Sequence, residues 1–285
     1  MGRDLYEASA AARELFERAD ETLGRPISSL CFDGPADELG QTVNSQPAIF
    51  VTSLACLAAA REALPLSEPA FVAGHSMGEY TALAAVRALD FANGLRLVES
   101  RGRLTQQAAD ATPGRMAAIL GLDETTAQAV CNTTGAELCN LNAPGQIVVG
   151  GRIAAVEAAC ALALERGAKR AIQLDVSGAF HTSLMQPAVE PFREAVLSAG
   201  LTTPIAPMVA NRTAHPMSDA GEIAEELVHQ LTNPVRWVAC VEYMAANGIT
   251  SIIEFGPGKV LTGLVKRIAP GIELRNINST ATLNR

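Results

Sequence analysis

The sequence predicts an α/β fold in which a largely parallel sheet, covered by helices on both faces, carries a smaller β-α-β-β-α-β insertion. Strand-like and helical segments alternate along most of the chain, which is the order that builds a parallel sheet. A short apolar strand at residues 71–73 runs into a glycine-flanked serine and then into an alanine-rich helix. From residue 113 to 178 the pattern changes to six short elements, which indicates a separate unit.

Composition indicates a globular chain without a membrane span. Of the 285 residues 48% are apolar, which is enough for a substantial core. Apolar runs are interrupted by Gly, Pro or charge well before the length of a bilayer span, and no signal-peptide pattern follows Met1. We expect a soluble cytoplasmic protein, or a plastid or mitochondrial one if the source is eukaryotic. The net charge of −8 argues against nucleic-acid and membrane binding, and six cysteines without a C-x-x-C pair indicate core residues, with no metal site.

Apolar periodicity and capping residues predict three long helices outside the insertion. The second begins with an Asn44-Ser45 cap and has Pro47 near its first turn, and the third is capped by Asp90. Their predicted spans are residues 6–23, 44–64 and 91–109.

The segment Gly74-His75-Ser76-Met77-Gly78 has the pattern of a nucleophile elbow. Gly74 and Gly78 remove side chains on either side of Ser76, so that strand and helix can approach closely. The helix predicted at residues 80–89 would direct free backbone N–H groups at whatever the serine attacks. A Gly-x-Ser-x-Gly pentapeptide alone is usually a loop, but the flanking strand and helix favour a nucleophile.

Arg101 is predicted to point inward. At 100° per residue it lies in the apolar arc of its helix, between Leu97 and Leu104. It could be a structural arginine that pairs with a buried carboxylate. Alternatively its partner is a carboxylate of the substrate, which the planar guanidinium matches with two hydrogen bonds.

Between residues 113 and 178 the elements follow the ferredoxin-like order β-α-β-β-α-β. Strands are predicted at residues 116–122, 136–142, 146–150 and 169–176, and helices at 123–131 and 152–165. The last strand leads to His181, the best candidate for a base, since His215 lies in a loop and His229 on a charged helix. A lone histidine is more often structural, but the small-residue turn before His181 favours function.

In the last third of the chain the sequence again predicts alternating strands and helices. Asp219 resembles the start of a capping box, and the loop from Gly256 to Lys259 is a βα turn that lacks the spacer of a Walker P-loop. Strands are predicted at residues 205–210 and 249–255, and helices at 219–231, 234–248 and 260–268.

Together these motifs resemble those of the malonyl-CoA:acyl carrier protein transacylases, enzymes of fatty-acid biosynthesis. The resemblance covers nearly the whole chain, and the combination of motifs is very specific. The matching segments are Asn-Ser-Gln-Pro-Ala around Gln46, Gly-His-Ser-Met-Gly-Glu-Tyr around Ser76, Glu-Ser-Arg-Gly around Arg101, Asn-Ala-Pro-Gly-Gln at residues 142–146, Gly-Ala-Phe-His ending at His181, and Gly-Pro-Gly-Lys-Val-Leu-Thr-Gly at residues 256–263.

The resemblance implies an α/β-hydrolase-like core from residues 1–112 and 179–285 and a ferredoxin-like subdomain from residues 113–178. It implies that Ser76 is the acylated nucleophile and His181 its general base. Arg101 would bind the malonyl carboxylate. The backbone carbonyl of Gln230 would orient the histidine, and the Met77 N–H would stabilise the oxyanion. The substrate pocket would include Gln46, His75, Asn142 and Phe180.

The implied reaction is a ping-pong transfer of malonyl from malonyl-CoA to the phosphopantetheine thiol of acyl carrier protein. It would need no metal or redox cofactor. The protein is expected to be a monomer. Phe180 should crowd a 2-methyl substituent and favour malonyl over methylmalonyl groups. Because the carrier protein is acidic, docking should use basic residues, for which the candidates are Lys169, Arg170, Lys259, Lys266 and Arg267.

One feature departs from the family pattern. Family members usually begin with a strand and a Gly-Gln-Gly-Ser-Gln loop whose first glutamine gives a second oxyanion donor. This sequence starts at Met-Gly-Arg-Asp-Leu, which ordinarily follows that loop, so we expect a truncated start. Loss of one such donor costs about 10²–10³ in rate.

Two other functions are compatible with the elbow. A serine esterase or thioesterase of the α/β-hydrolase kind would need a carboxylate, such as Asp175, to orient His181, and would not need an inward Arg101. An inactive paralogue would bind the carrier protein without transferring an acyl group.

Overall fold

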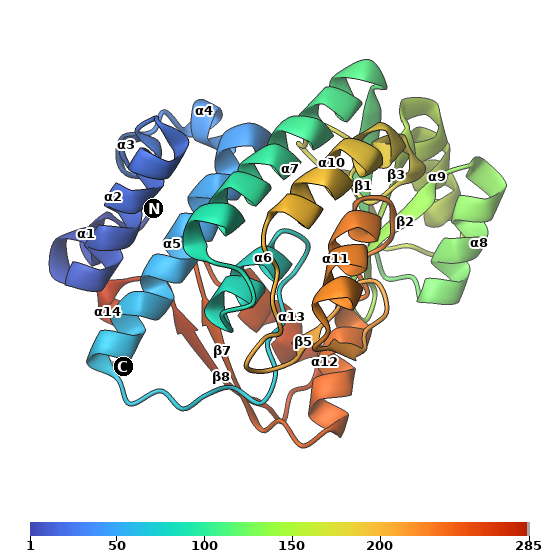
Figure 1. Cartoon of the computed structure of the whole chain (residues 1–285). Helices are drawn as coiled ribbons and strands as arrows, with labels where there is room; N and C mark the ends of the chain where they lie inside the picture. The colour runs from blue at the N-terminus through green and yellow to red at the C-terminus, as the bar shows by residue number, and fades with distance from the viewer. Residues whose placement is uncertain (284–285) are drawn as a thin grey trace.

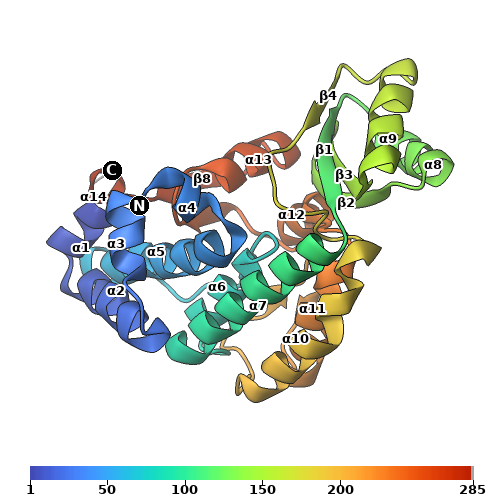
Figure 2. The same ribbon diagram turned by 90° about the horizontal axis from the view of Figure 1, so that it is seen from above.

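The computed structural model describes residues 1–283 and shows a helix-rich α/β core from which a smaller subdomain protrudes (Figure 1, Figure 2). Two long helices, α5 (Thr42–Ala63) and α7 (Phe91–Ala111), pack against each other through the core. Helix α2 (Ala10–Leu23) packs against both, and α10 (Gln186–Ser198) packs on α7. The large side chains fully buried in this apolar core include Leu5, Phe16, Phe50, Tyr80 and Phe192.

The single helix predicted at residues 6–23 is wrong, because the chain forms two helices there. α1 (Arg3–Ala8) ends at Ser9, whose backbone is extended with φ −119° and ψ 126°. The hydroxyl of Ser9 accepts a hydrogen bond from the N–H of Ala12 and so caps α2. The next two helices are short, α3 (Ile27–Asp33) and α4 (Ala36–Gly40).

The predicted cap of the next helix, at Asn44 and Ser45, is also wrong. Helix α5 begins two residues earlier, so that Pro47 lies inside it. A proline there removes a donor to the carbonyl of Val43. That carbonyl instead accepts a hydrogen bond from Nη2 of Arg25 at 3.4 Å, which helps the helix to tolerate the proline.

Helix α5 is the one helix among residues 1–283 that is long and apolar enough to cross a membrane by length and composition. However, 78% of its most apolar window is buried inside the protein. Such burial is typical of the core helix of a globular protein.

Two aspartates cap helices where the sequence predicts them. The carboxylate of Asp90 accepts from the N–H groups of Ala92 and Asn93 at the start of α7. Asp219 does the same for the second and third residues of α11 (Ala220–His229). These caps satisfy backbone donors that the first turn of a helix leaves free.

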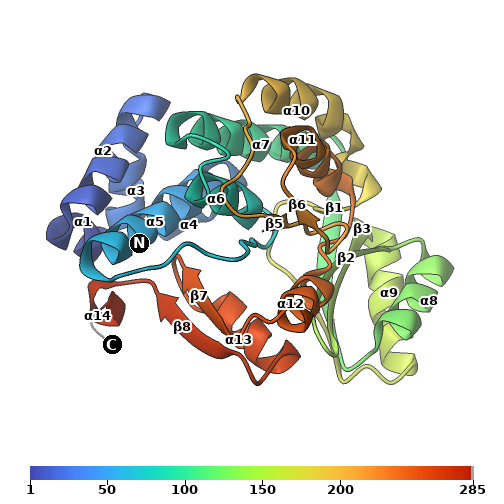
Figure 3. The ribbon, with the colours of Figure 1, turned by 60° about the horizontal axis from the view of Figure 1, so that its bottom comes forward.

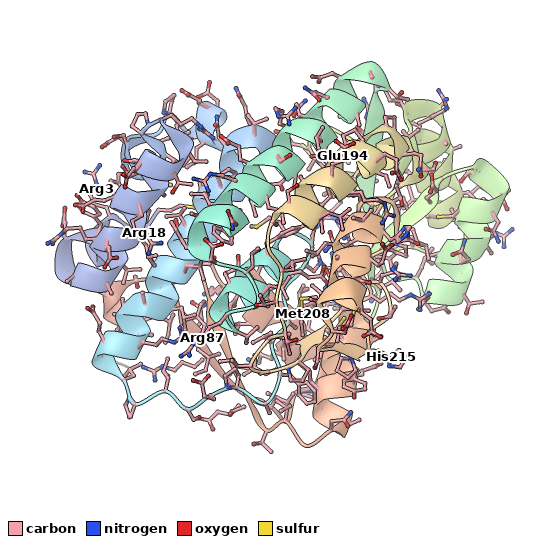
Figure 4. The ribbon with its side chains drawn as sticks, in the orientation of Figure 1. Arg3, Arg18, Arg87, Glu194, Met208 and His215 are labelled. Carbon is pink, nitrogen blue, oxygen red and sulfur yellow. The ribbon has the colours of Figure 1, made fainter. Side chains whose placement is uncertain are left out.

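Parallel strand pairing occurs in the core, as expected from the sequence, but only over short segments. β7 (Ser251–Phe255) pairs in parallel with β8 (Glu273–Ile277). The sequence analysis predicted the first of these strands but not the second. Val72 forms a parallel bridge with Met208, which lies in the middle of the molecule (Figure 4). The remaining elements of this region are β5 (Met208–Val209), β6 (Pro216–Met217), α12 (Trp237–Ala246), α13 (Val260–Ile268) and α14 (Thr280–Leu283) (Figure 3).

The subdomain has the predicted ferredoxin-like order. Its four-stranded antiparallel sheet has the order β2-β3-β1-β4, with α8 and α9 packed on the sheet. The boundaries at residues 113 and 178 stay a prediction. The elements are β1 (Gly114–Leu120), α8 (Glu124–Thr134), β2 (Glu137–Ala143), β3 (Gln146–Arg152), α9 (Ile153–Glu165) and β4 (Arg170–Gln173).

Strand β2 joins the subdomain to the core. The N–H of Leu141 donates to the carbonyl of Val235, and the N–H of Val235 donates to the carbonyl of Cys139. This two-bond connection places the end of β2, including Asn142, beside the turn at residues 74–78.

The turn at residues 74–78 connects the bridge at Val72 to α6 (Gly78–Ala85), and the two sides of the turn approach each other closely. A Cβ atom on Gly74 would lie 1.9 Å from the backbone carbon of Gly78 and 2.4 Å from the nitrogen of Glu79. A Cβ atom on Gly78 would meet nothing within 4 Å. The sequence analysis treated the two glycines alike, but only Gly74 is required by the close approach. Helix α6 also ends earlier than predicted, at Ala85.

We therefore predict opposite effects for two alanine substitutions in this turn. Gly74→Ala should lower the free energy of unfolding by about 1–3 kcal/mol or more, because backbone atoms must move. Gly78→Ala should leave it unchanged or raise it by up to about 1 kcal/mol. Equilibrium unfolding in urea measures both, and equal stability of the two variants would contradict the close approach.

Candidate active site

A cleft of about 1050 Å³ opens between the start of α5, the turn at residues 74–78 and the segment between β4 and His181. Side chains from both the core and the subdomain line it. Among the predicted site residues, the cleft is lined by Gln46, His75, Ser76, Met77, Arg101, Phe180 and His181. Sequence-distant elements therefore meet in one place.

Ser76 and His181 form a hydrogen-bonded pair in this cleft. Oγ of Ser76 lies 2.7 Å from Nε2 of His181. Nδ1 of His181 lies 2.9 Å from the carbonyl oxygen of Gln230, which can only accept, so Nδ1 carries the proton and Nε2 presents its lone pair to Ser76. The partner of Nδ1 is thus a backbone carbonyl, where an esterase would have a carboxylate. Asp175 is an exposed residue of the cleft wall.

The imidazole of His181 is held in its neutral form. Burial disfavours the imidazolium, and the Arg101 cation adds to this effect, so that the pKa of His181 falls to about 3. His181 is 4% exposed. At neutral pH the ring can therefore accept a proton from Ser76.

The other two histidines outside the turn take no part in these contacts. His215 lies edge-on to Tyr243 at 6.1 Å between ring centroids, at the edge of the molecule in Figure 4. His229 lies on α11, where its Nε2 is 3.1 Å from Glu225. This leaves His181 as the base candidate.

Arg101 points inward, as its helical position predicts, and is 4% exposed. Nη1 donates to Oε1 of Gln46 at 2.8 Å, and Nη2 donates to Oγ of Ser76 and to Oε1 of Gln230, both at 3.1 Å. The guanidinium lies over the ring of Tyr80, 5.7 Å from its centroid. Within residues 1–283 it makes no ion pair, and its buried Nε has no hydrogen-bond partner. The charge is therefore balanced by neutral oxygens only, which leaves an unmet demand for an anion.

Gln230 contributes through its side chain as well as its backbone. It lies in the 3-10 helix Gln230–Thr232, directly after α11, and is fully buried. Its Nε2 donates to the carbonyl of Ser76 at 2.9 Å and to Oε2 of Glu79 at 2.5 Å, while Oε1 accepts from Arg101. The sequence analysis identified only the backbone carbonyl.

Two further residues of the site were missed by the sequence analysis. Asn211 accepts a hydrogen bond from the N–H of Ser76 and donates one to the carbonyl of Gly74, both at 2.7 Å. Glu79 lies one helical turn after Ser76 and accepts from the N–H of Asn211 at 2.6 Å. Burial, together with the nearby Glu226, raises the pKa of Glu79 well above its usual range. An acidic residue in the first turn of an otherwise buried helix is the sequence signal that could have indicated Glu79.

Of the other predicted pocket residues, His75 and Phe180 line the cleft, whereas Asn142 is not among its lining residues and contacts His75. Nε2 of His75 lies 2.8 Å from Oδ1 of Asn142 on β2, and the His75 ring packs edge-on against Trp237. Burial lowers the pKa of His75, which keeps this ring neutral. Phe180 is half-buried beside His181. The Met77 N–H, at the start of α6, donates to no group of residues 1–283.

The basic residues predicted to dock the carrier protein lie on the surface. The five basic docking candidates are all exposed, and Arg267 donates to the side chain of Gln146 and to the carbonyl of Pro144. No group of three or more His, Cys, Asp or Glu side chains that could hold a metal ion occurs within residues 1–283.

Comparisons with known proteins show similarity over nearly the whole chain. A family model described as an acyl transferase domain matches residues 1–279. The malonyl CoA-acyl carrier protein transacylase of Bacillus subtilis (strain 168) is 45% identical over 273 residues, which cover 94% of this chain and 86% of the relative. The protein of that name from Haemophilus influenzae is 40% identical over 288 residues, covering 100% and 92%.

Solved structures show the same likeness. The acyl-carrier-protein-S-malonyltransferase of Bartonella henselae superposes with a TM-score of 0.96 at 40% identity, covering 100% of this chain and 92% of that one. A malonyl-transacylase solved in complex with a type II polyketide synthase acyl carrier protein gives 0.95 at 37% identity, covering 100% and 93%. With both its sequence and its fold matching, this chain belongs to the malonyl-CoA:acyl carrier protein transacylase family of acyltransferases.

Proposed function

We propose that this protein transfers a malonyl group from malonyl-CoA to the phosphopantetheine thiol of acyl carrier protein, through a malonyl ester on Ser76. The observation that carries the proposal is a buried guanidinium that has no carboxylate partner among residues 1–283 and is hydrogen-bonded directly to a serine that also contacts a neutral histidine. A malonyl thioester carries both a carbonyl for the serine and a carboxylate for the guanidinium.

The first half-reaction forms the acyl-enzyme. Nε2 of His181 takes the proton of Ser76 as Oγ attacks the thioester carbonyl, and the developing oxyanion accepts from the free N–H of Met77. The carbonyl of Gln230 stabilises the imidazolium by accepting from Nδ1. As the tetrahedral intermediate collapses, the C–S bond breaks and the imidazolium returns its proton to the coenzyme A thiolate.

The second half-reaction is the same chemistry in reverse. His181 takes the proton of the phosphopantetheine thiol, whose sulfur attacks the ester carbonyl, and Ser76 leaves with the proton from the imidazolium. Every step is a proton transfer or an acyl transfer, so the proposal includes no metal or redox cofactor. We place this activity in the cytoplasm and in fatty-acid biosynthesis.

Arg101 selects the acyl group and also affects the base. A malonyl carboxylate would replace the neutral oxygen of Gln46 and could use the free Nε, while Gln230 keeps its contact with Nη2. Acetyl leaves the buried cation without an anion, which costs binding energy. Neutralising the guanidinium also removes part of what lowers the pKa of His181, so the correct substrate makes the base stronger.

Phe180 is proposed to limit substitution at C2 of the acyl group. Its half-buried ring lies on the cleft wall, directly before His181 in the chain. A 2-methyl group on the malonyl unit would have to displace this ring.

Formation of the acyl-enzyme tests the proposal directly. Incubation with radiolabelled malonyl-CoA should place one label on Ser76, which peptide mapping by mass spectrometry locates, and Ser76→Ala should take up none. Release of the label by acyl carrier protein but slow release by water separates a transferase from an esterase. Absence of a label on the folded protein would leave the carrier-binding paralogue as the better description.

Substitution of Arg101 tests the selectivity. Arg101→Gln should lower kcat/KM for malonyl-CoA roughly 30-fold or more, because the substrate carboxylate loses its partner. This factor corresponds to a loss of about 2–5 kcal/mol in transition-state binding. Activity with acetyl-CoA should be unchanged or higher. Arg103→Gln, on the exposed face of the same helix, is the matched control. Undiminished malonyl transfer by Arg101→Gln would refute the assigned role.

The low pKa of His181 predicts an unusual pH dependence. Modification of Ser76 by a neutral sulfonyl fluoride should show no loss of rate between about pH 7 and pH 5, where an ordinary histidine becomes protonated. In Arg101→Gln the acid limb should move up towards 6.5, since one cause of the shift is removed. The unfolded imidazole takes up its proton near pH 6.5 and the folded one near 3, so stability should fall as the pH falls through this range. An acid limb near 6.5 in the unsubstituted protein would contradict the structure.

A further inference from the structure

Glu79 is a fully buried carboxyl group that lines neither the cleft nor the exterior. Its two oxygens accept one hydrogen bond each, Oε1 from the backbone N–H of Asn211 at 2.6 Å and Oε2 from Nε2 of Gln230 at 2.5 Å. Both partners contact Ser76. Glu79 therefore links Asn211 and Gln230, which both contact Ser76. The side chain of Glu79 itself does not contact Ser76.

The first connection decides which way the carboxamide of Gln230 faces. Glu79 and the carbonyl of Ser76 both require a donor, so Nε2 is directed at them and Oε1 is left facing Arg101. The opposite orientation would place an NH₂ group against the guanidinium and an oxygen against two oxygens. Glu79 thus helps to fix Oε1 of Gln230, the acceptor for Nη2 of Arg101, by binding the Nε2 of the same carboxamide.

The second connection supports the strained turn. Ser76 has φ 54°, in the left-handed region that residues other than glycine rarely adopt. Its N–H donates to Oδ1 of Asn211, whose Nδ2 donates to the carbonyl of Gly74. The contact between Glu79 and the backbone N–H of Asn211 anchors the residue that holds both sides of the turn.

From these contacts we propose that Glu79 is a positioning residue of the transfer reaction, which aligns Arg101 through Gln230 and Ser76 through Asn211. The inference rests on the proposed function for its choice of substrate. It requires two acceptor oxygens on one side chain, because both partners donate. A glutamine at position 79 offers one acceptor and one donor, so it must lose either the contact with Gln230 or the contact with Asn211.

The protein contains a matched control for this requirement. Glu254 also accepts a backbone hydrogen bond on each of its oxygens, Oε1 from the N–H of Leu261 at 3.0 Å and Oε2 from the N–H of Thr262 at 2.8 Å. Among residues 1–283 Glu254 has no recorded hydrogen bond to Ser76, Gln230 or Asn211. Loss of a hydrogen-bonded carboxylate is therefore separable from loss of alignment.

The test compares Glu79→Gln with Glu254→Gln in the full chain. Glu79→Gln should lower kcat for malonyl transfer by about 10- to 10²-fold with little change in KM, because small misplacements of reacting groups have effects of this size. It should also narrow the preference for malonyl-CoA over acetyl-CoA, since Arg101 loses its fixed acceptor. Glu254→Gln should keep both the kcat and the preference of the unsubstituted protein, even if its unfolding midpoint falls.

Two additional measurements keep the test decisive. If Glu79→Gln does not fold, Glu79→Asp retains two acceptor oxygens on a side chain one methylene too short to reach both partners, and should show the same change in preference. The rate at which a neutral sulfonyl fluoride modifies Ser76 needs the alignment but no malonyl group, so it remains informative even if malonyl transfer itself is not observed. A folded Glu79→Gln or Glu79→Asp variant with unchanged kcat, preference and modification rate would overturn the proposal.

Discussion

The buried charge of Arg101 is the constraint on which the arrangement of the cleft depends. A guanidinium removed from water must be hydrogen-bonded, and here two carboxamides and the serine hydroxyl supply neutral oxygens instead of a carboxylate. Neutral acceptors satisfy the donors but leave the charge in place. The same charge helps to keep His181 neutral, so the feature that attracts an anionic acyl group also prepares the base for its proton transfer.

Neutral acceptors must in turn be held in one orientation, because a carboxamide presents an oxygen on one side and an NH₂ group on the other. For Gln230 that orientation is imposed by Glu79 and by the carbonyl of Ser76. The charge of Arg101 therefore requires Gln230 to keep one orientation, and this in turn requires Glu79 to be in place. The result is a fully buried polar network in which each group limits the choices of the next.

Backbone strain is concentrated at the reacting pair. Only four non-glycine residues in the described chain have positive φ, and Ser76 and His181 are two of them. Such conformations persist when surrounding contacts hold them, and both residues are held by hydrogen bonds to Asn211 or Gln230. Gly74 provides the space for this turn, because a side chain there would collide with the start of α6.

The sequence by itself determined the elbow at Ser76, the inward direction of Arg101, the aspartate caps of α7 and α11, and the order of the subdomain, because these signals act within a few residues. It did not predict the break at Ser9, the start of α5 or the shortness of the core strands, which depend on packing and on a distant arginine. Only the tertiary structure revealed Glu79, Asn211 and the side chain of Gln230 as parts of the site. Their hydrogen bonds join residues 129 to 154 positions apart, and isolated buried polar residues leave no periodic pattern from which such contacts can be read.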